Sequence, residues 1–225
     1  IQMRPVNINF YKQAFVHKSV QKFIRGMENP PEYMKESYER YEFLGDSVLN
    51  LIVANYLFTK YPDESEGLLT RLRTKLVNGK TLSLFSTKLD LGQYIVLSTN
   101  VEKINGRTNS RILEDIFEAL ICAIYLDLGF KRAESFIIKT IERCIDFDKL
   151  LKDDNYKDIL LRFCQGKMKC IPTYLTTNTE GPPHNREFTV SCIIQEITYN
   201  CGKGKCKKTA EQNAAMETLK HFGQI

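Results

Sequence analysis

The sequence lacks several features that define other classes of protein. No apolar run free of charges approaches about 18 residues, so we expect no membrane-spanning helix. Residues 1–5 do not resemble a secretory signal. The seven cysteines form no CxxC pair, and their odd number favours reduced thiols over disulfides or zinc ligands. This use of cysteine predicts an intracellular protein, most simply a cytoplasmic one.

Histidine is also scarce, with three residues in a chain of 225. Only His17 lies in the first two thirds, where it is interpreted as a structural residue. No Ser-His or Cys-His arrangement for nucleophilic catalysis is therefore indicated. The net charge of +5 is too small to indicate nucleic-acid binding by itself, so local clustering of charge is the better guide.

Two pairs of carboxylates stand within apolar helical segments. Glu42 and Asp46 are four residues apart and Asp115 and Glu118 are three apart, so each pair shares one helix face. Because apolar residues continue both faces, we expect all four acids to point inward. Burying like charges without a partner is costly. Four hard oxygen donors with no nearby His or Cys ligand therefore favour a magnesium-type ion.

A second interpretation applies to either acid pair taken alone. A carboxylate pair on a helix is commonly a solvated face, or is neutralised by Lys and Arg. Two pairs that both lie in apolar segments favour the metal site over this alternative.

The first two thirds of the chain are predicted to be helical. We expect helices at about 7–25, 37–59, 66–78, 79–89, 110–128 and 132–144, a polar loop at 101–110 and a charged linker at about 146–156. Gly45 lies in the middle of the second helix, where glycine costs about 1 kcal/mol relative to alanine. Its presence there predicts the close approach of another backbone.

The last third changes to an α-β-β-β-α pattern, which predicts a small domain with helices on a sheet. Its elements are expected at 157–167, 172–179, 187–194, 197–201 and 206–222. Gly202 and Gly204 are expected to shape a turn before the last helix, whose positive end is free. A cluster of lysines surrounds that end: Lys203, Lys205, Lys207 and Lys208. This pattern favours a phosphate clamp, and a solvated basic turn is the alternative.

The segment 39–47, ERYEFLGDS, and the segment 112–119, ILEDIFEA, resemble the ribonuclease III family of double-stranded RNA endonucleases. Further similar blocks lie in the same order at 14–19, 66–73 and 76–78. The resemblance implies that the four acids form a magnesium-dependent cleavage site, in which Mn²⁺ can substitute. It also implies supporting roles for Glu39 and Glu66, and a dimer interface into which Phe43 inserts. Glu114 departs from the small residue usual in the family, and points about 100° away from Asp115 around the helix.

The last third resembles the double-stranded RNA-binding domain, through residues 172–174, 181–184, 188–190 and 202–215. The resemblance implies that Gln165 and His184 reach the RNA minor grooves, where 2′-hydroxyl groups distinguish RNA. Cys206 stands where the family usually has Ser, so we expect a weaker cap on the last helix.

Together these features predict an all-α endonuclease domain at 1–148, a linker at 149–155 and an α+β RNA-binding domain at 156–225. The predicted function is a homodimeric, magnesium-dependent endoribonuclease that cuts double-stranded RNA, and the resemblance implies staggered ends with short 3′ overhangs. Its expected partners are duplex RNA and a second copy of the chain, with no membrane and no small-molecule substrate. One alternative is a non-cleaving RNA-binding protein on the same fold. Another is a small-molecule hydrolase, against which the RNA-binding domain argues.

Overall fold

A computed structural model describes residues 4–151, 155–182 and 185–225 of the chain. The chain divides into two compact units, Ile1–Leu151 and Lys152–Ile225. Each unit has its own hydrophobic core. Within the described residues, no helix has the length and apolar character needed to cross a membrane.

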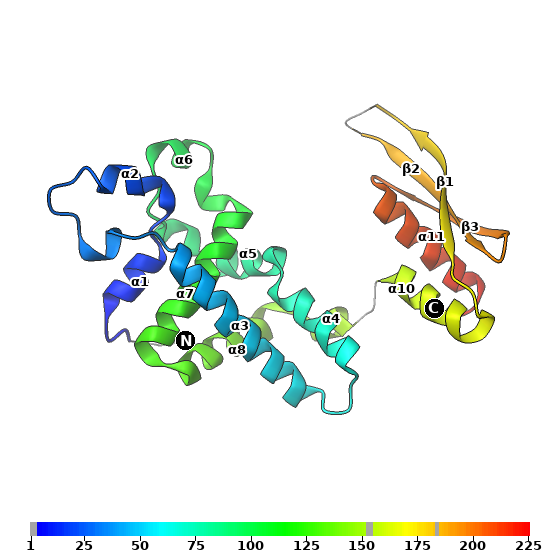
Figure 1. Ribbon diagram of the computed structural model, residues 1–225, viewed down its shortest axis with the longest axis horizontal. Coiled ribbons are helices and arrows are strands. Elements are labelled where there is room, and N and C mark those ends of the chain that lie inside the picture. Colours follow the sequence, from blue (N-terminus) through cyan, green and yellow to red (C-terminus); the bar gives the residue numbers. More distant parts are fainter. Residues whose placement is uncertain (1–3, 152–154, 183–184) are drawn as a thin grey trace. The chain divides into compact units, whose positions relative to one another are not determined.

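The first unit is built from helices (Figure 1). They are α1 (Ile8–Ala14), α2 (Gln21–Ile24), α3 (Glu39–Lys60), α4 (Glu66–Val77), α5 (Gly79–Lys88), α6 (Thr99–Lys103), α7 (Ser110–Leu128), α8 (Phe130–Cys144) and α9 (Phe147–Leu151). Asn or Ser side chains accept hydrogen bonds from free backbone amides at the starts of α1, α4, α5 and α7, which explains where these helices begin. The predicted all-α class of this unit is confirmed.

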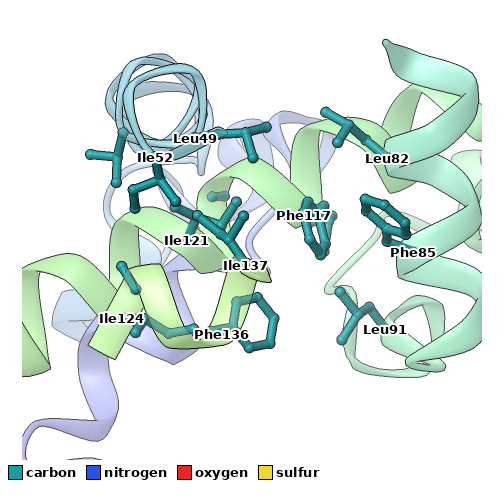
Figure 2. Close-up of a cluster of buried hydrophobic side chains, with 14 of the residues drawn as sticks. Leu49, Ile52, Leu82, Phe85, Leu91, Phe117, Ile121, Ile124, Phe136 and Ile137 are labelled. Atoms are coloured by element: carbon teal, nitrogen blue, oxygen red, sulfur yellow. The ribbon is translucent and has the colours of Figure 1, made fainter. Parts of the chain in front are cut away.

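Helix α7 lies at the centre of the first unit and packs against α1, α3, α5 and α8. Its side chains are apolar around most of its circumference, as expected for a buried helix. Figure 2 shows Phe117 and Ile121 of α7 among side chains from the neighbouring helices. The ring of Phe117 lies 5.4 Å from that of Phe85 and 5.8 Å from that of Phe136, measured between centroids. This packing fixes the helix that carries the second acid pair.

Three segments of the first unit differ from the sequence-based expectation. The helix expected at 7–25 is interrupted after Ala14, because Val16 forms a parallel bridge with Val96 far along the chain. The expected loop at 101–110 contains part of α6 and a 3₁₀ turn at Gly106–Thr108. Part of the expected linker is α9, whose Leu150 carbonyl accepts a hydrogen bond from Lys75 Nζ at 3.1 Å. The rest of the linker includes residues 152–154, which lie outside the described residues.

The second unit has the predicted α-β-β-β-α order, and its α+β class is confirmed. It comprises α10 (Tyr156–Phe163), β1 (Thr173–Glu180), β2 (Glu187–Ile194), β3 (Ile197–Gly204) and α11 (Lys207–His221). The strands form an antiparallel sheet in the order β1-β2-β3. Helix α11 packs on β2 and β3 and contacts α10 (Figure 1). A π-helical turn, Cys164–Met168, follows α10, so that helix is shorter than expected.

The expectation that the two glycines near the end of β3 shape a turn is wrong. Gly202 and Gly204 belong to β3 itself, which is longer than predicted. A β-carbon at Gly202 would lie 2.1 Å from the backbone nitrogen of Ala214, and one at Gly204 would lie 2.6 Å from that of Ala210. Glycine is therefore needed because the strand lies directly against the backbone of α11.

Candidate functional site

The two acid pairs are brought together where α3 packs against the backbone of α7 at Gly45. Glu42 and Asp46 lie on α3, on either side of Gly45, and Glu118 lies on α7 with Asp115 one turn before it. A β-carbon at Gly45 would lie only 1.9 Å from the carbonyl oxygen of Glu118. The predicted close approach at Gly45 is thus confirmed. It is an approach to the acidic segment of α7, so glycine permits the two pairs to lie side by side.

Burial differs among the four acids, and the expectation that all point inward is wrong for one of them. Glu118 is buried, with 8% of its surface exposed, while Glu42 and Asp115 are half-buried. Asp46 is exposed, and its Oδ1 accepts a hydrogen bond of 2.7 Å from Asn50 Nδ2 on the same helix. The site therefore runs from the packed surface between α3 and α7 out to solvent.

The carboxylates act on one another electrostatically. Burial raises the pKa of Glu118 to about 8, and the neighbouring charges of Asp46, Glu114, Glu42 and Asp115 add to the increase. Burial also raises the pKa of Glu42, with Asp115 as the next contributor. The pKa of Asp115 is raised by burial and is partly lowered by a hydrogen bond from Tyr38. A cation among these groups would relieve the repulsion that these shifts report.

The four proposed ligands lie near one another, but their carboxylate oxygens do not converge on one point. Within the described residues, no three His, Cys, Asp or Glu side chains converge closely enough to hold a metal ion. The donors nevertheless fit a hard cation in their chemistry, because they are carboxylate oxygens that already perturb one another. Their oxygen atoms would have to converge further to bind it.

The two supporting acids of the prediction lie in different surroundings. Glu39 accepts hydrogen bonds of 3.0 Å from both Lys18 Nζ and Ser37 Oγ, at the edge of the acid cluster. Lys18 also interacts electrostatically with Asp115. Glu66 lies at the start of α4 and lines a cavity of about 550 Å³ beside the later part of α3. The supporting roles of Glu39 and Glu66 stay predictions.

Two residues near the site were not assigned to it from the sequence. Glu114 is expected to point away from Asp115 around the helix, but its charge still helps to raise the pKa of Glu118. Burial raises the pKa of Glu114 itself, and the charges of Asp115 and Asp46 add to the increase. The available signal was its spacing of four residues from Glu118, which places both acids on one helix face. Tyr38 donates a hydrogen bond of 2.9 Å to Asp115, and its only sequence signal was a position one turn before Glu42.

An apolar surface lies on the same helix as the first acid pair. Phe43 is 78% exposed, Leu51 is 60% exposed and Phe58 is 69% exposed, all on α3. Leu51 and Phe58 also line the cavity between α3 and α4. Phe43 is thus available to a partner, and its place in a dimer interface stays a prediction.

The basic cluster of the second unit surrounds the start of α11. Lys203, Lys205, Lys207 and Lys208 are all exposed, as is Gln165 in the π-helical turn. Cys206 precedes α11 and its side chain makes no capping hydrogen bond of ordinary geometry. The weaker cap expected at this position stays a prediction. Its sulfur instead lies 3.2 Å from Thr209 Oγ1. His184, the other residue predicted to contact the minor groove, lies outside the described residues.

Comparison with known proteins adds a family to this geometry. A ribonuclease-III-like family model matches residues 7–144, and the double-stranded RNA binding motif matches residues 156–221. The chain is 39% identical over 212 residues to Ribonuclease 3 of Nitratiruptor sp., which covers 93% of this chain and 88% of the relative. It is 37% identical over 220 residues to Ribonuclease 3 of Chlorobaculum tepidum, which covers 97% and 79%. The nuclease domain of ribonuclease III from Campylobacter jejuni has a similar structure, with a TM-score of 0.55 and 35% identity over 63% of this chain and 91% of that one.

Proposed function

Because the chain belongs to the ribonuclease III family, we propose that it hydrolyses the phosphodiester bonds of double-stranded RNA as a homodimer, using carboxylate-bound Mg²⁺. The observation that carries the proposal is the meeting of two acid pairs on α3 and α7 in a chain that also contains a double-stranded RNA binding motif. We expect staggered products with short 3′ overhangs, and activity with Mn²⁺ in place of Mg²⁺.

The proposed ligands are Glu42, Asp46, Asp115 and Glu118. The cation supplies an activated water and neutralises charge on the phosphoryl oxygens when it is bound. The buried Glu118 carboxyl, whose pKa of about 8 reflects burial and like charges, would then have a counter-charge that keeps it ionised. Asp46, exposed on α3, would complete the set from the solvent side, from which we expect the RNA backbone to approach.

The second unit would hold the duplex. Lysines around the start of α11 are suited to phosphate oxygens, because their exposed cationic side chains and the backbone amides at a helix start both attract anions. Gln165 and His184 are proposed to contact the minor grooves on either side of this clamp. Such contacts recognise the shape of a duplex and its 2′-hydroxyl groups rather than its sequence.

A homodimer follows from the chemistry of the substrate. Each chain carries one cluster of four acids, and a duplex has two strands, so two copies are needed to cut both in one encounter. The exposed apolar residues of α3, including Phe43, offer a surface for this contact. The similar Campylobacter jejuni structure concerns structural flexibility in a region involved in dimer formation of that protein.

We also propose an intracellular, most simply cytoplasmic, location, since seven cysteines without a CxxC pair favour a reducing compartment.

The test is cleavage of long duplex RNA with and without Mg²⁺, followed by sizing of the products and mapping of their ends. Asp46→Asn and Glu118→Gln should each abolish cleavage and leave duplex binding intact, because each removes a proposed ligand while the RNA-binding unit is untouched. Asp63→Asn, in the exposed turn between α3 and α4, is the matched control and should cleave like the unaltered chain. Full Mg²⁺-dependent cleavage by either site variant would refute the metal assignment. Duplex binding without cleavage by the unaltered chain would favour the non-cleaving alternative.

A further inference from the structure

Tyr38 is held rigidly at the point where the chain enters α3. Its backbone N–H donates a hydrogen bond of 2.9 Å to the carbonyl oxygen of Val16. Its own carbonyl oxygen accepts from the backbone amides of Tyr41 and Glu42, at 2.7 and 2.9 Å. The backbone of Tyr38 is therefore fixed on one side to the segment after α1 and on the other to the first turn of α3.

The side chain of Tyr38 is equally constrained. Only 2% of the residue is exposed, and its ring lies 5.7 Å from the imidazole of His17, measured between centroids. His17 is itself buried and fixed, because its Nδ1 accepts a hydrogen bond of 3.1 Å from the backbone of Ser19. From this position the Tyr38 hydroxyl donates to Asp115 Oδ2 at 2.9 Å, across 77 residues of sequence.

We propose that Tyr38 is a positioning residue for the divalent cation. The Tyr38 hydroxyl holds one carboxylate oxygen of Asp115, so that the other oxygen can serve as a ligand. The inference rests on the proposed function, since it needs the four-acid site. One residue thereby links both acid-carrying helices: its backbone begins α3, which carries Glu42, and its side chain orients an acid of α7. Hydrogen bonds of this kind orient the ligands of metal sites, and losing one typically costs 10- to 100-fold in metal affinity or activity.

A purely structural role for this bond predicts a different result, and the chain contains a matched bond that separates the two. Tyr11 donates a hydrogen bond of 3.0 Å to Asp127 Oδ2 in the same unit. Asp127 is outside the acid cluster and also accepts backbone amides near the start of α1. Tyr11→Phe and Tyr38→Phe therefore each remove one tyrosine-to-aspartate hydrogen bond, and only the second removes one from a proposed ligand.

The experiment is a titration of the full chain with Mn²⁺, in which electron paramagnetic resonance measures the free ion in the absence of RNA. Tyr38→Phe should weaken Mn²⁺ binding by about 10- to 100-fold, and Tyr11→Phe should bind like the unaltered chain. In cleavage assays, the Mg²⁺ concentration for half-maximal rate should rise by a similar factor with Tyr38→Phe. Saturating Mg²⁺ should restore most of the rate, because the ligands themselves remain.

Several results would overturn the inference. Unchanged Mn²⁺ affinity in Tyr38→Phe would do so while leaving the proposed function intact, provided that the unaltered chain binds Mn²⁺ and cleaves duplex RNA. If Tyr38→Phe and Tyr11→Phe weaken Mn²⁺ binding equally, the hydrogen bond from Tyr38 to Asp115 has only a structural role. Failure of the unaltered chain to bind Mn²⁺ or to cleave would overturn the proposed function as well. Since the titration needs no turnover, it can be run in the cold, with circular dichroism to verify that each variant is folded.

Discussion

Replacing Gly45 with alanine should separate the two helices that carry the acids. The added β-carbon would lie 1.9 Å from the Glu118 carbonyl oxygen and 2.6 Å from its carbonyl carbon, whereas real β-carbons essentially never come closer than 3.0 Å. The obstacle is backbone, so no side-chain rotation can relieve it. Helices α3 and α7 must therefore move apart by about 1.1 Å at this point.

Two opposing terms set the size of the effect. Overpacking in a well-packed interior costs about 1–3 kcal/mol, and a backbone obstacle belongs at the upper end of that range. Alanine regains about 1 kcal/mol over glycine through its helix propensity. We therefore expect Gly45→Ala to lower the free energy of unfolding of the first unit by about 2 kcal/mol, or its melting temperature by about 4–8 °C. A displacement near 1 Å can also cost about 100-fold in rate.

The assay is chemical and thermal denaturation of the full chain, with duplex cleavage measured alongside. Gly67→Ala is the matched control, because Gly67 lies within α4 and a β-carbon there would meet nothing within 4 Å. This variant should be as stable as the unaltered chain or slightly more so. A Gly45→Ala protein that gained stability as Gly67→Ala does, with full cleavage, would refute the close contact between α3 and α7.

Without divalent cation, the folded protein should lose stability as pH rises from about 4.5 to about 8, because the raised pKa of Glu118 means that the folded state holds this proton more tightly than the unfolded chain. Denaturation curves across that range should show the decline, and a Glu118→Gln profile with the same slope would contradict it. Combined Lys207→Glu and Lys208→Glu should weaken duplex RNA binding and reduce its salt slope by about one per lysine, unlike Lys220→Glu at the other end of α11; equal slopes would count against the clamp. Phe43→Asp should shift the chain toward monomer in sedimentation, and a dimer of unaltered affinity would remove Phe43 from the interface.

The long helices and strand β2 were predictable from local patterns. Helix α7 was expected at 110–128 and lies at Ser110–Leu128, because a continuous apolar pattern runs between an Asn cap and Gly129. Strand β2 was expected at 187–194 and lies there. In these segments the local signal and the tertiary packing favour the same structure.

The errors fall where distant residues decide the structure. The helix expected at 7–25 ends early because Val16 pairs with Val96, a contact that no local pattern indicates. Gly202 is expected in a turn because glycine is common in turns. In the structure it lies in β3, where glycine is needed because the strand contacts the backbone of α11. Such contacts depend on the fold as a whole.

Some features of the candidate site were likewise predictable from local spacing, and others depend on distant contacts. Helical spacing predicted which acids share a face, and the glycine between Glu42 and Asp46 predicted a close contact. Spacing could not predict that Asp46 is exposed, since that depends on where the contact between α3 and α7 ends. Nor could it identify the bond from Tyr38 to Asp115, which joins residues far apart in the sequence.

Anomalous diffraction from crystals grown with Mn²⁺ is the most direct measurement of the central claim, because it locates the ion without relying on activity. We expect an anomalous peak coordinated by carboxylate oxygens of four residues: Glu42, Asp46, Asp115 and Glu118. A peak elsewhere in the first unit, with these four side chains unligated, would contradict it.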